Sequence, residues 1–450
     1  MVRFLTVVLF VPSFCFGFYS VKLQSASPTE MKLELAVDAE ALKTKNFQHG
    51  QRSFLKLEHS TSLASNLDGT PDIPRIHQWI AVPEGAEYEV KVTLSNPKVI
   101  SNVLLYPVQK DRLEKDRPVF QYDDQSYLRK SWVGGEGATL HKTMKLGPVT
   151  ILPVALTPVQ YNAASKELRI YQHMTAEIFS SAKKDSRLSV PEITPFIAAQ
   201  LRGLVLNAEE VLKDVTVAKA GSLLVAAPKA LMTHAKQLGA IRQNDGMTVT
   251  YFEVPSAVEA PQMVELLKTH HQNLKLDAVL LFGDEALIPF HRGTLSELGD
   301  VLYSFLEGED EVSDLAIGRL PVSDTAEATT IIHKLKKHRE LAAAGKLSKN
   351  VMLLAHNEEY PGKYTANQEE VRAAANPKKL QFEVQYGGDK ATNEAVIESA
   401  TKKNFAIINY RGHGSSVDWW DWDINNAAFG FGQIDALPDN SSKLSVFFNV

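Results

Sequence analysis

The hydrophobic pattern of this chain changes character at Gly221. From there on, short apolar runs alternate with stretches whose apolar residues recur at helical spacing. The run 222–227 predicts a buried strand, and the amphipathic stretch 326–341 predicts a helix that Asp324 or Thr325 can cap. Strands that alternate with helices form parallel sheets covered by helices on both faces. We therefore expect residues 222–450 to form an α/β domain with a mostly parallel sheet flanked by helices.

Further elements of this domain follow from the same pattern. We expect helices over 231–243 and 260–271 and from 366 and 393, and strands over 247–254, 277–283, 314–322 and 350–355 and around 382 and 405.

The residues before Gly221 have the pattern of an antiparallel β protein. Residues 88–94 and 167–179 alternate apolar and polar side chains, and turn-forming pairs such as Asn96-Pro97 separate the short strands. We expect residues 18–212 to form an antiparallel β-sandwich with helix confined to its end, over 197–211. Residues 213–221 would be an exposed linker, in which Lys219 suits a basic-specific processing cut.

The first 17 residues predict a secretory signal peptide. Arg3 supplies the positive charge and residues 4–11 the short apolar core, and Cys15 and Gly17 place small side chains at the two positions that a signal peptidase needs. This run is too short to span a bilayer, and no later segment reaches the required length. The prediction is a secreted or cell-surface protein with no membrane span. The alternative interpretation is an N-terminal core strand.

The composition narrows the class of protein. A chain of 450 residues is too long for one ordinary core, and 44% hydrophobic and 22% charged residues are typical of soluble globular domains. A formal net charge of −5 without basic runs gives no reason to expect a nucleic-acid partner. Cys15 is the only cysteine, so a mature protein would have no disulfide, no thiolate metal site and no thiol nucleophile within these 450 residues.

A histidine follows the apolar run 405–410 in the turn Gly412-His413-Gly414. Glycine on both sides lets the backbone turn sharply and leaves the imidazole accessible at the sheet edge. A histidine base beside a nucleophile, with the Gly414 N–H facing a developing oxyanion, is the minimal arrangement for acyl transfer. The nucleophile is expected just past the next apolar run, 444–450, on the same edge. The alternative is a turn histidine that ends a strand.

Glu358 and Glu359 follow the strand expected over 350–355, beside His356. A carboxylate there could lie across the carboxyl edge of the sheet and hold His413 in the right tautomer. The alternative is a pair of solvated loop carboxylates.

The segment 417–423 holds three of the five tryptophans, directly after the histidine. Aromatic rings in a carboxyl-edge loop can wall a substrate pocket, or the loop can fold its own aromatic side chains inward. Its carboxylates Asp418, Asp421 and Asp423 could bind a hard cation such as calcium, although their spacing is not that of an EF-hand loop.

Two other polar features each allow a functional and a purely structural interpretation. Arg319 could pair with a carboxylate near the site or simply close a strand end. The pair His270-His271 on a helix is expected on a solvated face rather than at a metal. The sequence contains no zinc helix of the His-Glu-x-x-His type, no Gly-x-Ser-x-Gly elbow and no P-loop.

Several segments together resemble the gingipain family of secreted cysteine peptidases. They follow the family's order: Leu280–Asp284 with Ile288-Pro289, Asp314–Val322 leading into Ala326–Ala328, Asn409–Gly414 and Val446–Val450. The ordered set covers about half of the chain, and the β-rich region before it resembles the family's N-terminal pro-domain. The resemblance implies a caspase-like fold for residues 222–450 and a pro-domain over residues 18–212.

The resemblance also implies roles for individual residues. His413 matches the family's catalytic histidine, and Gly414 matches its oxyanion-hole neighbour. Glu358 falls where the family has the acidic partner of the histidine, with Glu359 as a competitor. The family's cysteine nucleophile would come about two residues after Val450, and this sequence departs from the pattern there because it ends.

Substrate preference does not transfer with the resemblance. The family's basic-residue specificity depends on an acidic pocket residue, for which Glu369 or Glu370 are the candidates here. Both fall within an expected helix, and a solvated helix face explains them equally.

The sequence as a whole predicts the zymogen of a secreted cysteine endopeptidase, with a signal peptide, a β-sandwich pro-domain and an α/β domain. We expect the α/β domain to be C-terminally incomplete, since domains rarely end on an uncovered apolar strand. Its partners would be protein or peptide substrates and its own pro-domain, which should cap the carboxyl edge of the sheet until cleaved near Lys219. No cofactor is expected to be required, and calcium could serve as a structural ion. The alternative is a non-catalytic secreted binding or adhesion protein on a degenerate peptidase scaffold.

Overall fold

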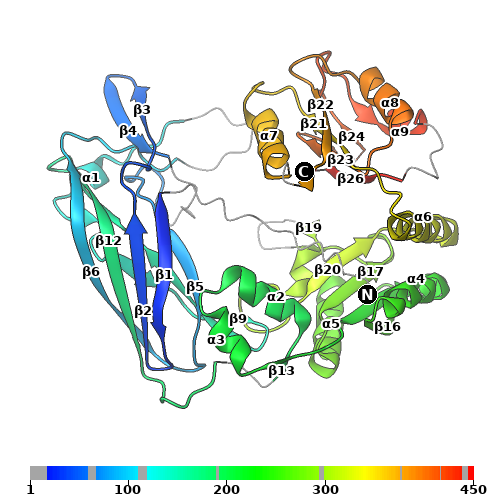
Figure 1. Ribbon diagram of the computed structural model, residues 1–450, viewed down its shortest axis with the longest axis horizontal. Coiled ribbons are helices and arrows are strands. Elements are labelled where there is room, and N and C mark those ends of the chain that lie inside the picture. The colour runs from blue at the N-terminus through cyan, green and yellow to red at the C-terminus, as the bar shows by residue number, and fades with distance from the viewer. Residues whose placement is uncertain are drawn as a thin grey trace. The chain divides into compact units, whose positions relative to one another are not determined.

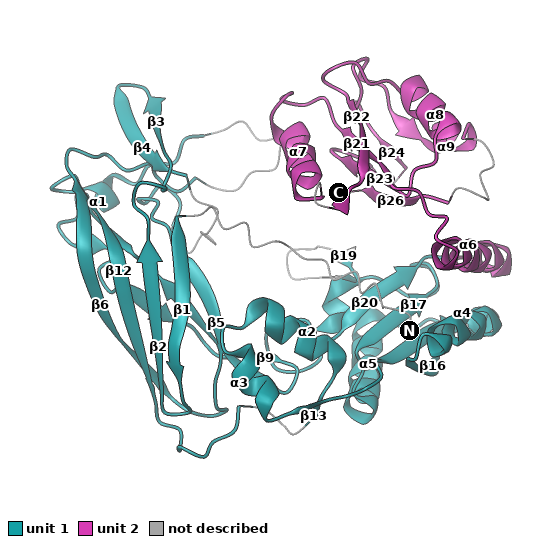
Figure 2. Cartoon of the chain, in the orientation of Figure 1, with its two compact units in different colours: residues 1–321 teal, residues 322–450 magenta. Residues whose placement is uncertain are grey.

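The computed structural model describes residues 18–58, 67–109, 119–188, 192–292, 298–375, 378–415, 417–437 and 444–449, the side chains of Arg292 and Leu298 excepted. The predicted signal peptide with Cys15, and Val450, lie outside these residues. The chain divides into two compact units, residues 1–321 and 322–450, whose elements are labelled in Figure 1 and coloured by unit in Figure 2.

The first unit begins with the predicted β-sandwich. One sheet has the order β1-β2-β12-β11-β7 with β6 also paired to β12, and the other has the order β5-β10-β8 with β9 also paired to β10. Every pairing in both sheets is antiparallel, as predicted. The bounds are β1 (Tyr19–Ala26), β2 (Glu30–Val37), β5 (Ile76–Ala81), β6 (Tyr88–Ile100), β7 (Trp132–Val133), β8 (Ala138–Leu140), β9 (Met144–Leu146), β10 (Val149–Leu156), β11 (Val159–Asn162) and β12 (Glu167–Ser180). The hairpin β3 (Thr44–His49) and β4 (Arg52–Leu57) and the short helix α1 (Asp124–Tyr127) complete this part.

Strand β10 is buried along its whole length, and its two faces serve different cores. Leu152, Val154 and Leu156 pack into the core between the two sheets. Val149 and Ile151 face the other way and pack with residues of helices α2 and α3. Because successive side chains of a strand point to opposite faces, a strand covered on both sides is apolar throughout.

The single helix expected over residues 197–211 is instead two helices, α2 (Pro195–Leu204) and α3 (Ala208–Lys213). The break comes from contacts with strand β5. Val205 is extended and Leu206 N–H donates to the Trp79 carbonyl at 2.9 Å. The Asn207 side chain bonds both the N–H and the carbonyl of Ala81, at 2.8 and 2.9 Å. Helical periodicity could not reveal this break because the partners are more than 100 residues away.

The rest of the first unit contains a four-stranded parallel sheet in the order β16-β15-β17-β20. Its elements are β15 (Ser222–Pro228), η1 (Lys229–Leu231), α4 (Met232–Asn244), β16 (Thr248–Val254), α5 (Ala260–Leu274), β17 (Ala278–Phe282), η2 (Val301–Ser304) and β20 (Ala316–Leu320). Two small pairs accompany it, β13 (Glu192–Ile193) with β14 (Thr216–Val217) and β18 (His291–Arg292) with β19 (Leu298–Gly299).

The prediction of a solvated face was wrong for His271. Met263, Leu267 and His271 recur every four residues along α5, so they share its buried face. The His271 Nε2 lies 3.1 Å from the Glu307 carboxylate, and the hydrogen bond to His271, which outweighs burial, lowers the pKa of Glu307.

Buried aspartates join the sandwich region to this parallel sheet. Asp277, just before β17, accepts the N–H of Phe196 at the start of α2 and that of Ser222 in β15, both at 2.7 Å. Asp314, just before β20, accepts the N–H of Gly147 between β9 and β10 at 3.2 Å. Burial raises the pKa of Asp314, although its N–H donors oppose the shift.

Asp310 and Val312, in the loop before Asp314, add contacts between the same two parts of the first unit. Asp310 accepts the main-chain N–H of Lys145 at 2.7 Å, and Val312 packs into the cluster that β10, α2 and α3 form. These contacts lie at the amino-terminal edge of the first parallel sheet. A pro-domain cap over a carboxyl edge therefore stays a prediction.

The second unit holds a four-stranded parallel sheet in the order β22-β21-β23-β26. Its elements are α6 (Thr325–Ala343), β21 (Asn350–Ala355), α7 (Lys363–Ala375), β22 (Gln381–Tyr386), α8 (Asn393–Lys402), β23 (Ile407–Arg411), β24 (Asp418–Trp419), β25 (Phe429–Gly430), α9 (Phe431–Asp435) and β26 (Val446–Asn449). Asp324 caps α6, as one of the two predicted alternatives, by accepting the N–H groups of Ala326 and Glu327.

The strand–helix alternation predicted a mostly parallel sheet flanked by helices, and both units contain one. The parallel strands fall into two sheets rather than one. The sequence did not reveal this division, because periodicity identifies strands and not their partners. In the second unit Tyr364 of α7 packs on one face of β21 with Val351 and Leu353, and Val396 of α8 packs on the other face. Within the described residues, no helix is long and apolar enough to cross a membrane.

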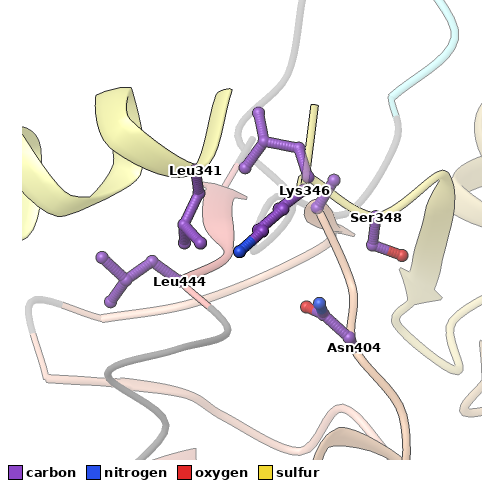
Figure 3. Close-up of a pocket in the computed structure, with 7 residues that line it drawn as sticks. Leu341, Lys346, Ser348, Asn404 and Leu444 are labelled. Carbon is purple, nitrogen blue, oxygen red and sulfur yellow. The ribbon is translucent and has the colours of Figure 1, made fainter. Parts of the chain in front are cut away.

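A small pocket lies at the amino-terminal edge of the second sheet, where α6 ends and strands β21, β23 and β26 begin (Figure 3). It is lined by Leu341, Lys346, Leu347, Ser348, Asn404, Ala406 and Leu444. The empty space between the lining atoms is about 180 Å³, which includes space open to solvent. The residues that the sequence analysis singled out follow the carboxyl ends of the same strands, so this pocket is not part of their site.

Candidate active site

The candidate site is built where neighbouring parallel strands end. Ala355, the last residue of β21, pairs with Arg411, the last residue of β23, and Tyr410 of β23 pairs with Asn449, the last residue of β26. Glu358 follows β21 and His413 follows β23. Because parallel strands share the direction of the chain, both side chains belong to the carboxyl edge of one sheet.

The structure brings His413 and Glu358 together. The His413 Nε2 lies 2.8 Å from Glu358 Oε2 and 3.2 Å from the Tyr364 hydroxyl. The Trp420 ring stacks on the imidazole at 5.0 Å, and the rings of His356 and Tyr364 meet it edge-on at 4.9 and 5.4 Å. A histidine whose Nε2 faces a carboxylate is held in one orientation.

The glycines around His413 are required by close packing. A side chain at Gly412 would collide with the Cβ of His356 and the hydroxyl of Tyr410. A Cβ at Gly414 would lie 2.9 Å from the Asp418 carbonyl oxygen. The Tyr410 hydroxyl donates to the carbonyl of His413 at 2.7 Å and so fixes the turn. The oxyanion role of the Gly414 N–H stays a prediction.

Glu358 is a negatively charged neighbour of His413. Burial alone would raise its pKa, but hydrogen bonds from Lys363 and His413 outweigh burial and hold the pKa of Glu358 below its usual value. The Lys363 Nζ lies 2.6 Å from Oε2, the same oxygen that faces His413. Glu358 is therefore a carboxylate at neutral pH, able to stabilise an imidazolium beside it.

Glu359 does not share this position. Its backbone has a positive φ of 51° and its side chain is exposed. The geometry thus favours Glu358 over Glu359 as the neighbour of His413, and the catalytic role of either residue remains a prediction.

The tryptophans of segment 417–423 divide between the two predicted alternatives. Trp422 is fully buried and its indole N–H donates to the Asn393 side chain at 2.8 Å. Trp419 stacks between Tyr410 and Phe429. Trp420 alone of the three stacks on His413, and it is 40% exposed. Two rings therefore anchor the loop and one forms a wall of the site.

The carboxylates of this loop are not assembled as a ligand set. Asp423 accepts the N–H groups of Asn425 and Ala427 in its own turn, and Asp418 accepts the Ser415 hydroxyl at 2.7 Å. Asp421 has a positive φ of 51°. Across the described part of the chain, no three His, Cys, Asp or Glu side chains are arranged to hold a metal ion.

The remaining candidates lie elsewhere. Arg319 closes a strand end: its guanidinium is buried and pairs with Asp300 at 2.7 Å in the first unit. Glu369 accepts the Tyr386 hydroxyl at 2.7 Å and pairs with Arg372 at 3.2 Å on its own helix. Glu370 is exposed on the same helix.

Three side chains around His413 were not assigned a role from the sequence: His356, Lys363 and Tyr364. Helix α7 begins at Lys363, three residues before its predicted start, and its first turn brings Lys363 and Tyr364 to the site. The adjacency of His356 to Glu358 was visible in the sequence, but its contact with the imidazole of His413 depends on pairing between β21 and β23.

Comparison with known proteins gives matches in both parts of the chain. The sequence model of Peptidase family C25 matches residues 217–450, and a second model, Propeptide_C25, matches residues 21–210. Gingipain R2 of Porphyromonas gingivalis is 24% identical over 406 residues, which cover 85% of this chain and 53% of that protein. Lys-gingipain W83 of the same organism is 23% identical over 383 residues, which cover 78% and 22%. The chain thus spans about half the length of gingipain R2 and less of Lys-gingipain W83.

Two solved structures are also similar. A crystal structure of the Arg-specific cysteine proteinase gingipain R is 21% identical, covering 52% of this chain and 55% of that chain with a TM-score of 0.45. A complex of the pro- and mature domains of Porphyromonas gingivalis RgpB is 24% identical, covering 42% and 97% with a TM-score of 0.37. The C25 model alone accounts for more than half of the 450 residues. The chain therefore belongs to peptidase family C25.

Proposed function

We propose that this chain is part of the zymogen of a secreted cysteine endopeptidase, with residues 18–212 as its pro-domain. Membership of family C25 and the match to the family's propeptide support the class of enzyme. The names of the relatives do not fix the substrate of this chain, and we propose only that it cleaves peptide bonds in proteins or peptides.

The observation that carries the proposal is the His413–Glu358 pair at the carboxyl edge, one strand away from β26. Cys15 is the only cysteine among the 450 residues, so we propose that the nucleophile comes from sequence after Val450. A residue that follows β26 would emerge at the edge where His413 follows β23. Trp419 donates to the Asn449 side chain at 3.2 Å and ties the end of β26 to the loop after His413.

In the proposed reaction, His413 takes the thiol proton and the thiolate sulfur forms a bond to the peptide carbonyl carbon. The Gly414 N–H would stabilise the resulting oxyanion. His413 then gives its proton to the amine nitrogen as the C–N bond breaks. Water hydrolyses the thioester with His413 as the base, while Glu358 orients the imidazole and stabilises its charged form.

The decisive test is to determine the sequence encoded after Val450 and to treat the resulting protein with a thiol-reactive peptidyl probe. We expect a cysteine within the next few residues and labelling at that position. Labelling should be strong only after cleavage near the exposed Lys219, because the pro-domain is proposed to maintain latency. A stop codon, or no labelling before or after cleavage, would favour the non-catalytic binding protein. Equal labelling of cut and uncut protein would contradict latency.

The choice between the two glutamates gives a separate prediction. Replacing Glu358 with Gln in a protein that carries the proposed cysteine should lower kcat roughly hundredfold with little change in KM, because the neutral amide cannot stabilise the imidazolium. Glu359→Gln is the matched control, since that side chain is exposed, and its kcat should stay within about twofold of the wild type. Steady-state kinetics on a peptide substrate measures both. A larger loss for Glu359→Gln would reverse the assignment.

A further inference from the structure

Glu358 is held from two sides by residues that the proposed reaction does not use. Its backbone N–H donates to Nδ1 of His356 at 3.0 Å, and its carboxylate oxygen Oε2 accepts from Lys363 Nζ at 2.6 Å. That oxygen is the one that lies 2.8 Å from Nε2 of His413. We call His356 and Lys363 the Glu358 clamp.

The His356 side of the clamp is fixed by the sheet. The His356 N–H donates to the Arg411 carbonyl at 3.0 Å, so His356 is tied to the end of the strand that leads into His413. Its side chain is 5% exposed and packs edge-on against His413 and Trp420. Gly412 lets the turn approach closely, since a side chain there would collide with the Cβ of His356.

The hydrogen bond from Glu358 defines the chemical state of His356. A ring nitrogen that accepts a main-chain N–H carries no proton. Burial, together with the nearby His413, lowers the pKa of His356, and Lys363 acts in the same direction while Glu358 opposes it. The neutral imidazole with an unprotonated Nδ1 is therefore the state that supports the backbone of Glu358.

The Lys363 side of the clamp acts on the carboxylate. Lys363 is the first residue of α7 and has a positive φ of 43°, and its Nζ lies over the ring of Tyr364 at 4.6 Å from the centroid. The Glu358 side chain is 34% exposed, so a carboxylate without this partner could rotate toward solvent. With Lys363 and His413 on one oxygen, the rotation of the carboxylate group is fixed.

We propose that His356 and Lys363 are positioning residues for the proposed catalytic pair. His356 fixes the backbone of Glu358, Lys363 fixes its carboxylate, and together they direct Oε2 at Nε2 of His413. This proposal rests on the proposed function for its catalytic meaning. Its first test needs no peptidase activity, so the two proposals can fail separately.

The test for Lys363 is an NMR titration of the Glu358 carboxyl carbon, assigned with Glu358→Gln, in the wild type, Lys363→Met and Lys363→Arg. Methionine keeps the length of the side chain but removes the charge and the donor, so the pKa of Glu358 should rise. Arginine keeps both, so the titration should stay close to that of the wild type. An unchanged titration in Lys363→Met would overturn this half of the proposal.

The test for His356 is hydrogen exchange of the Glu358 amide in His356→Asn and His356→Gln. The amide oxygen of Asn can accept the N–H two residues on, as in an Asx turn, whereas Gln directs its amide to the position of Nε2. Exchange should be near the wild-type rate with Asn and roughly tenfold faster with Gln, the size expected for one lost hydrogen bond. Equal rates in the two variants would overturn this half.

A kinetic readout separates positioning from general stability. In a protein that carries the proposed cysteine, His356→Gln and Lys363→Met should each lower kcat at least roughly tenfold with KM unchanged, and His356→Asn and Lys363→Arg should restore most of it. Equal kcat losses in the matched variants, or losses that appear in KM, would contradict a positioning role. The NMR results stand even if no form of the protein cleaves peptides, and in that case only the proposed function fails.

Discussion

Replacing His413 with alanine should lower kcat by about four to six orders of magnitude in a protein that carries the proposed cysteine. In the proposed reaction the imidazole is the base that activates the thiol and the acid that protonates the leaving amine, and it lies 2.8 Å from Glu358 and stacks on Trp420. The measurement is a progress curve on a peptide substrate, with a thiol-reactive probe to test whether the nucleophile is still present.

The matched control is His333→Ala, which removes an exposed histidine from helix α6 of the same unit. Its kcat should not change measurably. Far-UV circular dichroism should be the same for both variants, because the His413 side chain points into the site and does not fill a core cluster. Activity of His413→Ala close to that of the wild type would remove the histidine from the mechanism.

Replacing Arg319 with methionine should destabilise the first unit by about 3–5 kcal/mol, the cost of leaving the partners of a buried charge unpaired. The side chain is 6% exposed and binds both oxygens of Asp300, at 2.7 and 2.8 Å. It also donates to carbonyl groups of the loop after β17, those of Gly283, Asp284, Ile288 and Pro289. Methionine fills part of the volume but leaves these acceptors without a donor.

The free energy of unfolding is measured by urea denaturation of the whole chain, with the transition of the first unit followed by hydrogen exchange in β17 and β20. Arg319→Lys is the informative comparison. Lysine keeps the charge but cannot form the two-pronged contact with Asp300, so its loss of stability should be intermediate. A loss below about 1 kcal/mol for Arg319→Met would mean that water replaces the guanidinium in this loop.

The strands and helices after Gly221 could be predicted because local periodicity specifies each of them. The pairing of Glu358 with His413 could also be anticipated, since both follow strands whose carboxyl ends share an edge. The choice between Glu358 and Glu359 could not, because it depends on a backbone angle: the positive φ of Glu359 leaves its side chain exposed.

Contacts between distant segments account for what the sequence did not reveal. The break between α2 and α3 is set by Asn207 and the backbone of Ala81, which lie 126 residues apart. His271 is buried because its helix face packs against the sheet, although two adjacent histidines are typical of a polar surface. In each case the deciding partner has no signature in the local pattern.

The unequal burial of the three neighbouring tryptophans has a consequence for how such a site could diversify. Trp419 and Trp422 hold the course of the loop through Tyr410 and Asn393. Trp420 covers the imidazole and contributes little to that framework. Mutations at position 420 would therefore change the surroundings of the proposed catalytic histidine at small cost to folding, whereas mutations at 419 or 422 would be removed by selection for stability. We therefore expect position 420 to be the place in this loop where relatives differ, and with it the substrates that they accept.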